Sequence, residues 1–428
     1  MLLALLLAAA ATPVPGLDQL YPDLDSLYLD LHQSPELSFH EEKTAAKVAD
    51  RLRRAGFEVT TAVGKTGVVG VLRNGPGPTV LLRTDLDALP VLEKTNLPFA
   101  SKVTTKNDAG ETVPVMHACG HDVHMTSWVG AATLLAQSRD KWHGTLVMVG
   151  QPAEETVGGA TAMLGDGLYK RWPKPDYAVA VHDTPDIASG NVAIVPGPAL
   201  ANVDTVEITI HGRGSHGAKP QASIDPIVIA ASTVLRLQTI VSRELNPLDP
   251  AVVTVGSFHA GTKSNIIPDE AKLQITVRSY KDEVQKHILA SIARIAKAEA
   301  AAAGATQEPT IWVDPHNAHA TVNDPALSQR LSAALSRGLG NASVVEFSPQ
   351  MVAEDFSEYG RAGVPAVLIW VGASPEAKLA QSRASGTPLP SLHSSGFFPD
   401  RERTIRTAVS ALTYSALDLF SVRAPERR

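Results

Sequence analysis

The chain has 428 residues, which is too long for one small hydrophobic core and predicts two or three domains. Its content of 44% hydrophobic, 19% charged and 5% aromatic residues is that of an ordinary globular protein, which excludes a disordered, collagen-like or coiled-coil chain. The formal net charge of −6 lacks the basic field that a nucleic-acid-binding protein needs. Because Cys119 is the only cysteine, an intramolecular disulfide is impossible.

The chain begins with an apolar run of leucine and alanine, Met1–Ala11, which Pro13 ends. The run is shorter than the ~20 apolar residues of a transmembrane helix, and no other stretch reaches that length. Ala8 and Ala10 have the spacing of a cleavage site, so residues 1–16 are expected to be a signal peptide and the mature protein to be periplasmic or secreted. No Lys or Arg precedes the run, so a cytoplasmic protein with an apolar N-terminus is the alternative.

Strand-like and helix-like segments alternate through the first half of the chain. Ser38 and Glu41 have capping-box spacing ahead of an apolar stripe, which predicts a helix that ends near Gly56. A second helix is expected at Val123–Gln137. This alternation predicts a doubly wound α/β domain, in which functional groups lie past the carboxyl ends of the strands. The apolar runs that suit its buried strands are Gly67–Leu72, Thr79–Arg83, Thr145–Gly150 and Tyr177–Val181.

A different pattern follows Pro198. The order β-α-β-β-α-β is that of a ferredoxin-like sandwich, so an α+β domain at 199–313 is expected to interrupt a catalytic domain made of 17–198 and 314–428. The expected elements of the inserted domain are strands at about 206–210, 251–258, 273–279 and 310–313, with helices at about 225–243 and 282–302. The returning chain is expected to form a helix at 326–339, a strand at 364–371 and a closing helix at about 404–419.

Polar residues directly follow three of the apolar strands. Asp85 and Asp87 come after the second run, and two close carboxylates repel each other unless a cation or another partner holds them. Glu154 and Glu155 follow the third run, and adjacent side chains can face a metal and a substrate separately. His182 follows the fourth run. Taken singly, each could also be an ordinary polar turn.

The densest cluster is HACGHDVH at 117–124, with three histidines, one cysteine and one aspartate in eight residues. Thiolate and imidazole bind zinc and other late first-row metals. Gly120 allows the backbone to turn, so that Cys119 and His121 can point at one site. A metal site is therefore expected here, with His124 capping or packing at the start of the next helix.

Further motifs occur later in the chain. The turn GRGSHGAKP presents His216, the segment GTKSNIIP contains Asn265 ahead of Arg278, AEDF ends at Phe356, and His393 follows the last apolar strand. Each of these by itself is typical of an ordinary turn or loop. The histidines without such a setting are expected at the surface or in packing: His32, His40, His143, His287, His316 and His319.

Together, the motifs RTDLDALP, HACGHDVH, QPAEE, SHGAKP, GTKSNIIP, EDF and the late histidine resemble the di-metal aminoacylase and carboxypeptidase family. The similarity is greatest to its amidohydrolase branch, which includes hippurate hydrolases and hydrolases of auxin–amino-acid conjugates. The motifs occur in the family's order and spacing over nearly the whole chain after the leader. The resemblance implies a metal-binding α/β domain interrupted by a lid or dimerisation domain.

The resemblance also implies a ligand set for two divalent ions, manganese or zinc, with cobalt or nickel also possible. Cys119 occupies the bridging position. His121 and His182 would complete one site, and Glu155 and His393 would complete the other.

The remaining roles follow from the same resemblance. Glu154 matches the general base that acts on metal-bound water, and Asp87 matches a carboxylate that orients a ligand. His216 matches a histidine that stabilises the oxyanion, often from a partner subunit. Asn265 and Arg278 match residues that hold the substrate's carboxylate.

The implied activity is metal-dependent hydrolysis of the amide bond in an N-acyl or N-aroyl amino acid, by a homodimer without a nucleic-acid or membrane partner. A dipeptidase or carboxypeptidase on the same site is the alternative enzyme. An exported metal- or peptide-binding protein is the alternative of another class, but the presence of Glu154 favours catalysis.

The chain departs from the family pattern at four positions. Thr156 and Val157 stand where glycine is usual, Asp183 stands where an apolar residue follows the histidine, and Gly217 stands where alanine is common. None of these removes a ligand or the base, so they are expected to affect substrate fit and the charge around the site.

Overall fold

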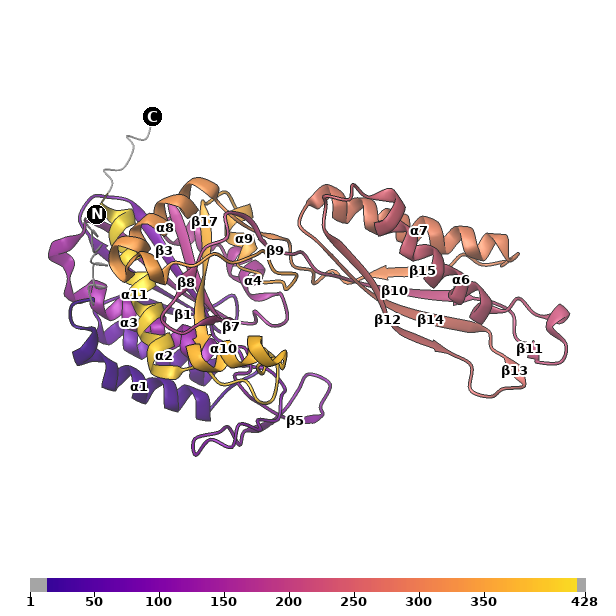
Figure 1. Cartoon of the computed structure of the whole chain (residues 1–428), viewed down its shortest axis with the longest axis horizontal. Helices are drawn as coiled ribbons and strands as arrows, with labels where there is room; N and C mark the ends of the chain where they lie inside the picture. Colours follow the sequence, from indigo (N-terminus) through magenta and orange to yellow (C-terminus); the bar gives the residue numbers. More distant parts are fainter. Residues whose placement is uncertain (1–13, 422–428) are drawn as a thin grey trace, which may run out of the picture. The chain divides into compact units, whose positions relative to one another are not determined.

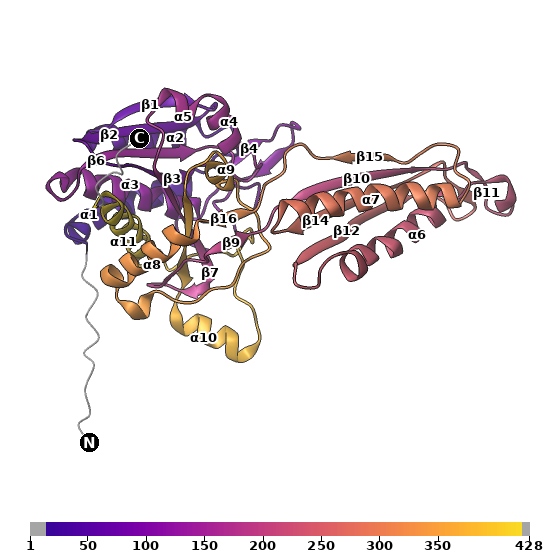
Figure 2. The same ribbon diagram turned by 90° about the horizontal axis from the view of Figure 1, so that it is seen from above.

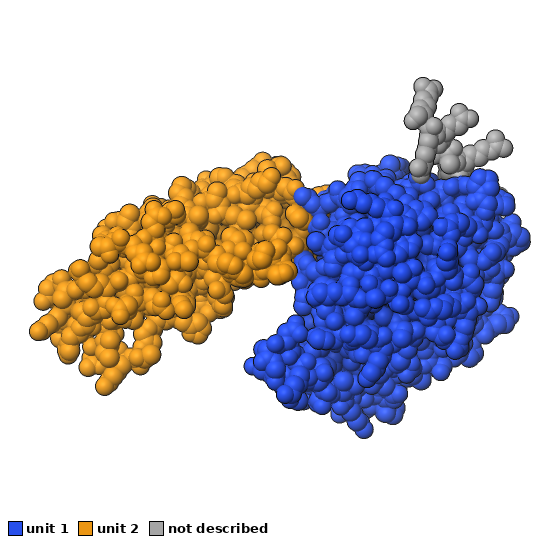
Figure 3. Space-filling model, turned by 180° about the vertical axis from the view of Figure 1, so that it is seen from behind, with its two compact units in different colours: residues 1–197, 322–348, 355–428 blue, residues 198–321, 349–354 orange. Residues whose placement is uncertain are grey.

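The computed structural model describes residues 14–421, so nearly all of the expected signal peptide at 1–16 lies outside the described residues. No helix within the described part is long and apolar enough to cross a membrane. The chain divides into two compact units, of which the first comprises 1–197, 322–348 and 355–428 and the second comprises 198–321 and 349–354 (Figure 3). The second unit is thus an insertion in the first. Whether the units act as a catalytic domain and a lid stays a prediction.

A mixed sheet in the order β1-β2-β6-β3-β7-β17-β8 forms the centre of the first unit (Figure 1). The neighbours β6, β3, β7 and β17 run parallel, whereas β1, β2 and β8 pair antiparallel. Every residue of β3 and β17 is buried, as their continuous apolar sequences predict. The strands are β1 (Glu58–Val63), β2 (Gly67–Asn74), β3 (Thr79–Asp85), β6 (Gly144–Gln151), β7 (Tyr177–Ala188), β8 (Val192–Ala193) and β17 (Ala366–Ser374).

Helices cover both faces of this sheet, which confirms the predicted α/β architecture. Val80 and Leu82 pack with the larger helices in one hydrophobic core, while Leu81, between them, is equally buried on the other face. That other face carries α4 (Gly159–Gly165) and α9 (Ser357–Arg361), which contact β6 and β17. The larger helices are α1 (Leu17–Gln33), α2 (Glu42–Arg54), α3 (His121–Gln137), α8 (Pro325–Leu339) and α11 (Arg401–Phe420).

The second unit is the predicted ferredoxin-like sandwich. Its antiparallel sheet has the order β12-β14-β10-β15, and α6 and α7 lie along it (Figure 2). Residues of β14 alternate between exposed and buried, so both helices pack on one face and leave the other exposed. The elements are β10 (Asp204–His211), α6 (Pro226–Thr239), β12 (Ala251–Ala260), β14 (Glu270–Ser279), α7 (Asp282–Ala302) and β15 (Thr310–Val313).

Short strands and α-helices lie between these larger elements. They are β4 (Thr104–Lys106), β5 (Thr112–Pro114), α5 (Leu168–Arg171), β9 (Gly197–Leu200), β11 (Ser215–His216), β13 (Ile266–Ile267), β16 (Thr321–Asn323) and α10 (Glu376–Ser385).

The turn that leads into α3 is set by one glycine. Gly120 has φ of +77°, a left-handed value that favours glycine, and α3 begins with the next residue, His121. A Cβ on Gly120 would lie 2.3 Å from Oδ1 of Asp183, closer than atoms can approach. The turn therefore has room only for glycine.

Further along α3, the indole of Trp128 donates a hydrogen bond of 2.9 Å to the Leu82 carbonyl and fixes the helix on β3.

The substitution Gly120→Ala is expected to destabilise the protein by about 3 kcal/mol, because it adds a clash to an unfavourable φ. The measurement is the urea-unfolding midpoint. Gly165→Ala in α4 is the matched control, since a Cβ there would meet no atom within 4 Å. Equal midpoints for the two variants would contradict the steric argument.

Candidate metal centre

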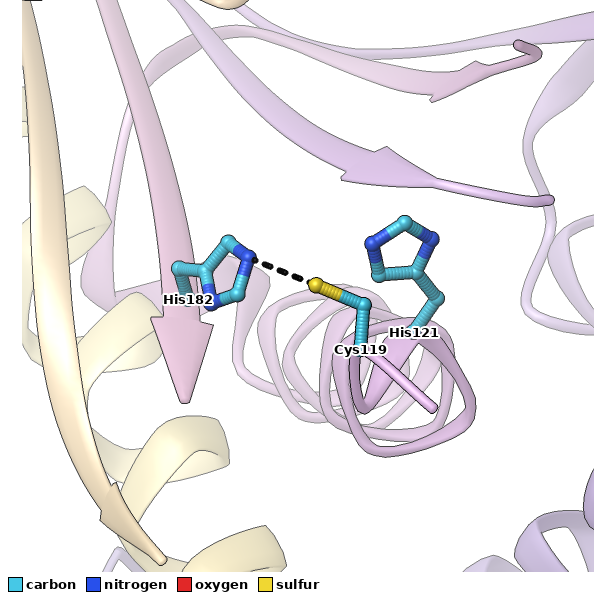
Figure 4. A group of neighbouring side chains, drawn as sticks. All are labelled: Cys119, His121 and His182. Carbon is cyan, nitrogen blue, oxygen red and sulfur yellow. Dashed lines mark hydrogen bonds between the residues drawn. The ribbon is translucent and has the colours of Figure 1, made fainter. Parts of the chain in front are cut away.

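Five potential ligands meet where the parallel strands end. Cys119 and His121 lie at the turn into α3, His182 lies on β7, and Glu155 follows β6. His393 comes from the loop after α10, where its amide donates a 2.8 Å hydrogen bond to the Ala118 carbonyl beside Cys119. Figure 4 shows the thiol of Cys119 directed at His182 with the His121 ring beside it. The structure thus brings together residues that are up to 274 positions apart.

The distances between these side chains suit metal binding. The Cys119 sulfur lies 3.6 Å from Nε2 of His182 and 3.1 Å from Nε2 of His393. The latter nitrogen is 3.4 Å from Oε1 of Glu155. Cys119 belongs to two groups, one with His121 and His182 and the other with Glu155 and His393, and in each group the ligand atoms lie within 4.8 Å of one another. Two ions sharing a thiolate would fit this arrangement.

Hydrogen bonds to main-chain carbonyls fix the orientation of two imidazoles. Nδ1 of His121 donates to the Asp87 carbonyl at 2.8 Å, and Nδ1 of His182 donates to the Asp183 carbonyl at 2.7 Å. A nitrogen that faces a carbonyl carries the proton, so Nε2 is the atom that each imidazole offers to a metal. Burial lowers the pKa of His121, but Asp85, Asp87 and Glu155 outweigh burial and raise it well above its ordinary value, so a bound metal would replace the Nε2 proton of this residue. Nε2 of His121 and Oε1 of Glu155 are buried without a hydrogen bond among the described residues. Such buried polar atoms call for a cation, so the donor set fits a metal.

The electrostatic environment also favours a cation. Burial, together with the carboxylates of Glu155 and Glu154, raises the pKa of the Cys119 thiol well above its ordinary value. Burial lowers the pKa of His182, so this imidazole is neutral. A divalent ion would instead lower the pKa of the Cys119 thiol, because it stabilises the thiolate directly.

A buried network fixes the end of β3. Arg83 is 1% exposed and donates hydrogen bonds to Asp85 at 2.8 Å, Gln151 at 3.0 Å and Asp355 at 3.2 Å. Asp355 also accepts from the amide of Ala160, the second residue of α4, at 2.9 Å. The AEDF motif, which contains Asp355, therefore supports the ends of β3 and β6 from behind the site.

His124 forms part of the same buried network. Its Nδ1 donates to Oδ1 of Asp85 at 2.9 Å, and its Nε2 donates to Oδ1 of Asp183 at 3.2 Å. Burial lowers the pKa of His124, but these two carboxylates outweigh burial and raise the pKa to about 9. Burial alone would raise the pKa of Asp85, but His121, His124 and Arg83 outweigh burial and hold this pKa well below its usual range. The sequence missed this role of His124 because both partners are distant in the chain.

Asp87 connects two parts of the site. Its Oδ2 accepts hydrogen bonds from the Ser38 hydroxyl at 2.6 Å and from the Glu155 amide at 3.0 Å. Its carbonyl orients His121, so Asp87 contacts two of the five potential ligands. The prediction that Ser38 and Glu41 form a capping box is wrong, because both side chains bond to distant loops instead. The amide of Thr44, in the first turn of α2, donates a 2.7 Å hydrogen bond to Oε2 of Glu36.

Comparisons with known proteins identify the family. Residues 81–393 match the model of peptidase family M20/M25/M40. The chain belongs to this family. The family expected from the sequence motifs is therefore confirmed.

Two relatives carry different names. Over 352 residues the chain is 38% identical to thermostable carboxypeptidase 2 of Saccharolobus solfataricus, covering 81% of this chain and 85% of that protein. Over 285 residues it is 40% identical to hippurate hydrolase of Campylobacter jejuni, covering 66% and 71%. A solved structure from Bacillus subtilis, described as a dinuclear metal-binding peptidase of the M20 family, matches with a TM-score of 0.77 at 31% identity, covering 94% and 99%.

The residues after the paired glutamates, Thr156 and Val157, stand where the resemblance implies glycine, and the backbone there is unfavourable for a side chain. Val157 has φ of +54°, a left-handed value that is unfavourable for a β-branched side chain. Ala153, just ahead of Glu154, has φ of +50°. Strained backbone of this kind costs about 1–3 kcal/mol per residue and persists where the surrounding structure holds it.

Three expected site residues belong to the second unit. His216 is exposed on β11, and its Nδ1 accepts a 3.0 Å hydrogen bond from the Ala218 amide, so Nε2 carries the proton and is a donor. Gly217 donates to the Asn265 carbonyl at 2.8 Å, which brings His216 and Asn265 onto neighbouring segments. Arg278 lies on β14, where burial lowers its pKa.

The departure at Gly217 has a steric reason. A Cβ there would lie 3.1 Å from the main-chain carbon of Asn265, which is tighter than ordinary contact. Glycine therefore lets the two segments of the second unit approach more closely than alanine would.

His32 is a buried ionised residue that the sequence did not reveal. It lies at the end of α1, with Nδ1 2.6 Å from Asp122 and Nε2 3.2 Å from Glu93. Burial lowers its pKa, but hydrogen bonds to Asp122 and Glu93 outweigh this and raise the pKa to about 9. The partners are 90 and 61 residues away, so no local pattern marks the contact. His32 thereby fixes the first turn of α3 to α1.

The substitution His32→Gln is expected to have a pH-dependent effect on stability. Because the folded pKa exceeds the unfolded value of 6.5, the charge of His32 stabilises the fold fully below about pH 6.5, and this contribution is lost as the pH rises through about 9. The difference in unfolding free energy between wild type and variant should shrink by about 3 kcal/mol across that range. Urea titrations at pH 6 and pH 9.5 measure it.

The matched control is His40→Gln, at a histidine whose side chain is 52% exposed opposite Asp108. Exposed ion pairs contribute little to stability. A constant difference for His32→Gln at both pH values would contradict the assigned charge.

Proposed function

We propose that this protein is a metal-dependent amidohydrolase that cleaves the amide bond of N-acyl or N-aroyl amino acids. The observation that carries the proposal is the pairing of Glu154 with Glu155. Glu155 faces Cys119 and His393, while Oε2 of Glu154 lies 3.8 Å from Nε2 of His121 at the same site. One carboxylate is thus available as a ligand and its neighbour as a base.

The proposed cofactors are two divalent ions, manganese or zinc, although cobalt or nickel would also suit these ligands. Cys119 would bridge them, with His121 and His182 on one ion and Glu155 and His393 on the other. When bound, such ions lower the pKa of water towards neutrality and polarise an amide carbonyl.

The proton transfers are assigned to Glu154. Its carboxylate would accept a proton from the attacking water and then donate it to the leaving nitrogen. Glu154 is only 6% exposed, which keeps the base shielded from bulk water. Asp87 would support the reaction by holding the Glu155 amide and the His121 ring in place.

The second unit would supply the substrate contacts. The Nε2–H of His216 would donate to the developing oxyanion, a contact worth about 3 kcal/mol in the transition state. Arg278 and Asn265 would bind the terminal carboxylate of the substrate, and a guanidinium can do so with two parallel hydrogen bonds. The unit would close as a lid over the bound substrate.

A dipeptidase or carboxypeptidase on the same site is the second candidate, favoured by the 38% identity to a carboxypeptidase. The two candidates differ in the group on the acyl side of the scissile bond. A turnover screen with metal-reconstituted protein, using acetyl, benzoyl, indolyl and aminoacyl amino acids, separates them. Acetyl or benzoyl substrates should be preferred, and a preference for free aminoacyl groups would support the peptidase instead.

We also propose a homodimer formed through the second unit. Its strand β12 is at the edge of the sheet, and Phe258 on that strand is 41% exposed. Leu235 on α6 is 74% exposed, and an apolar helix face beside an open sheet edge favours pairing with a second copy. Light scattering should give a dimer mass, and a monomer mass would contradict the proposal.

Export to the periplasm or outside the cell is proposed on the basis of the apolar run at 1–11 and the Ala8 and Ala10 spacing. Mass spectrometry of the N-terminus after expression with an export pathway would detect cleavage.

Substitution of the proposed base and of the proposed bridging ligand is expected to change different quantities, namely turnover and metal content. Glu154→Gln should keep the bound metal and lower turnover by at least about 100-fold, because the amide cannot accept the proton. Cys119→Ala should lower the metal content well below that of the wild type, because both ions lose a ligand. Metal analysis and turnover of each variant test this, with exposed His143→Ala as control.

A further inference from the structure

The segment Ser38–Glu41, here named the clamp segment, contacts both loops that carry the site carboxylates. The Ser38 hydroxyl donates a 2.6 Å hydrogen bond to Oδ2 of Asp87, in the loop after β3. The same oxygen accepts the Glu155 amide at 3.0 Å, in the loop after β6. Ser38 therefore fixes the carboxylate that in turn fixes the main chain of Glu155.

Glu41 holds the same loop on the other side of Glu154. It is fully buried, and its Oε1 accepts hydrogen bonds from the amides of Phe39 and Ala153, each at 2.8 Å. Its Oε2 accepts the Thr66 hydroxyl at 2.5 Å. Ala153 is the residue with φ of +50° that directly precedes Glu154. The hydrogen bond from Glu41 thus holds an unfavourable backbone conformation at the point where the direction of Glu154 is set.

Phe39 secures the far end of the loop. A Cβ on Gly158 would lie 3.3 Å from the Phe39 ring, so the ring packs directly against that glycine. Nζ of Lys65 lies 3.9 Å from the centre of the Phe39 ring and packs on its face. The amides of Gly158 and Gly159 both donate to the Ala153 carbonyl, at 3.2 Å and 3.1 Å. The loop is therefore closed upon itself, and the clamp segment holds it directly at Ala153 and Gly158 and, through Asp87, at Glu155.

We propose that Ser38 and Glu41 are positioning residues that set the directions of the Glu154 and Glu155 carboxylates. This inference rests on the proposed function for its kinetic consequence, but its effect on the ligand Glu155 does not. A base and a ligand on adjacent residues must diverge by a fixed angle, and a loop with strained backbone does not keep that angle without external support. Groups that orient metal ligands typically alter metal affinity or activity 10–100-fold when removed.

The chain offers a conservative variant, Glu41→Gln. The glutamine that it introduces can present its carbonyl oxygen to the amides of Phe39 and Ala153 and its NH₂ to the Thr66 hydroxyl. Burial and the nearby charge of Asp87 raise the pKa of Glu41 to about 7, so a neutral side chain is already compatible with this position. Glu41→Gln should therefore restore what Glu41→Ala loses.

The experiment uses the full chain loaded with Co²⁺. Glu41→Ala should lower kcat by about 10–100-fold, leave KM within about 3-fold, and change the visible absorption of bound Co²⁺, because Glu155 is displaced. Glu41→Gln should keep kcat and the spectrum near those of the wild type. Ser38→Ala should resemble Glu41→Ala, and its matched control is Ser189→Ala, which removes a 2.5 Å hydrogen bond to Asp400 away from the site.

Wild-type kcat and Co²⁺ spectrum in both Glu41→Ala and Ser38→Ala would overturn the positioning role. A loss in Glu41→Gln equal to that in Glu41→Ala would also overturn it, since the geometry is kept. If Glu41→Ala does not fold, Ser38→Ala and Thr66→Val provide the same two readouts. If the wild type hydrolyses none of the acyl amino acids, the proposed function fails, while the Co²⁺ spectrum still tests the clamp segment.

Discussion

Buried charge at the carboxyl ends of β3, β6 and β7 is the constraint on which the first unit depends. Arg83 is withdrawn from water and its charge is balanced by Asp85 and Asp355. Removing one partner of such a group typically costs about 3–5 kcal/mol, because an unpaired charge stays behind. The strand ends, the AEDF segment and the start of α4 must therefore assemble together, and the potential metal ligands stand on this assembled base.

The metal centre adds a second demand to the same place. Cys119, His121 and Glu155 have buried atoms that the described residues leave without hydrogen-bond partners or in a protonation state unsuited to a metal. The surrounding residues do not pair with these atoms but hold the side chains in fixed positions. The carbonyls of Asp87 and Asp183 hold two imidazoles, Gly120 allows the turn, and His32 holds the helix start. A cation entering the site would find its ligands already oriented, so less ordering is required on binding.

The insertion of the second unit separates two tasks. The first unit carries every expected ligand and the proposed base, while His216, Asn265 and Arg278 belong to a unit with its own core. If the second unit supplies the substrate contacts, as proposed, those contacts can change without disturbing the buried charge network. The departures fit this division: Gly217 affects spacing in the second unit, whereas Val157 and Asp183 lie close to the potential metal ligands Glu155 and His182.

The amino-acid sequence alone predicts most of the main strands and helices in their order, the ferredoxin-like insertion and the ligand cluster around Cys119, but it does not predict α1, β1 or α10. Those features leave local signals: continuous apolar runs, alternation of period two, and a density of His and Cys within eight residues. The sequence also predicts the helix α2, whereas its prediction of a capping box at the start of that helix is wrong. The partners of Ser38, Glu41, His32 and His124 became visible only in the folded chain. Hydrogen bonds between residues 25 to 112 positions apart leave no periodicity, and they arise because parallel strands bring distant loops to one edge of the sheet.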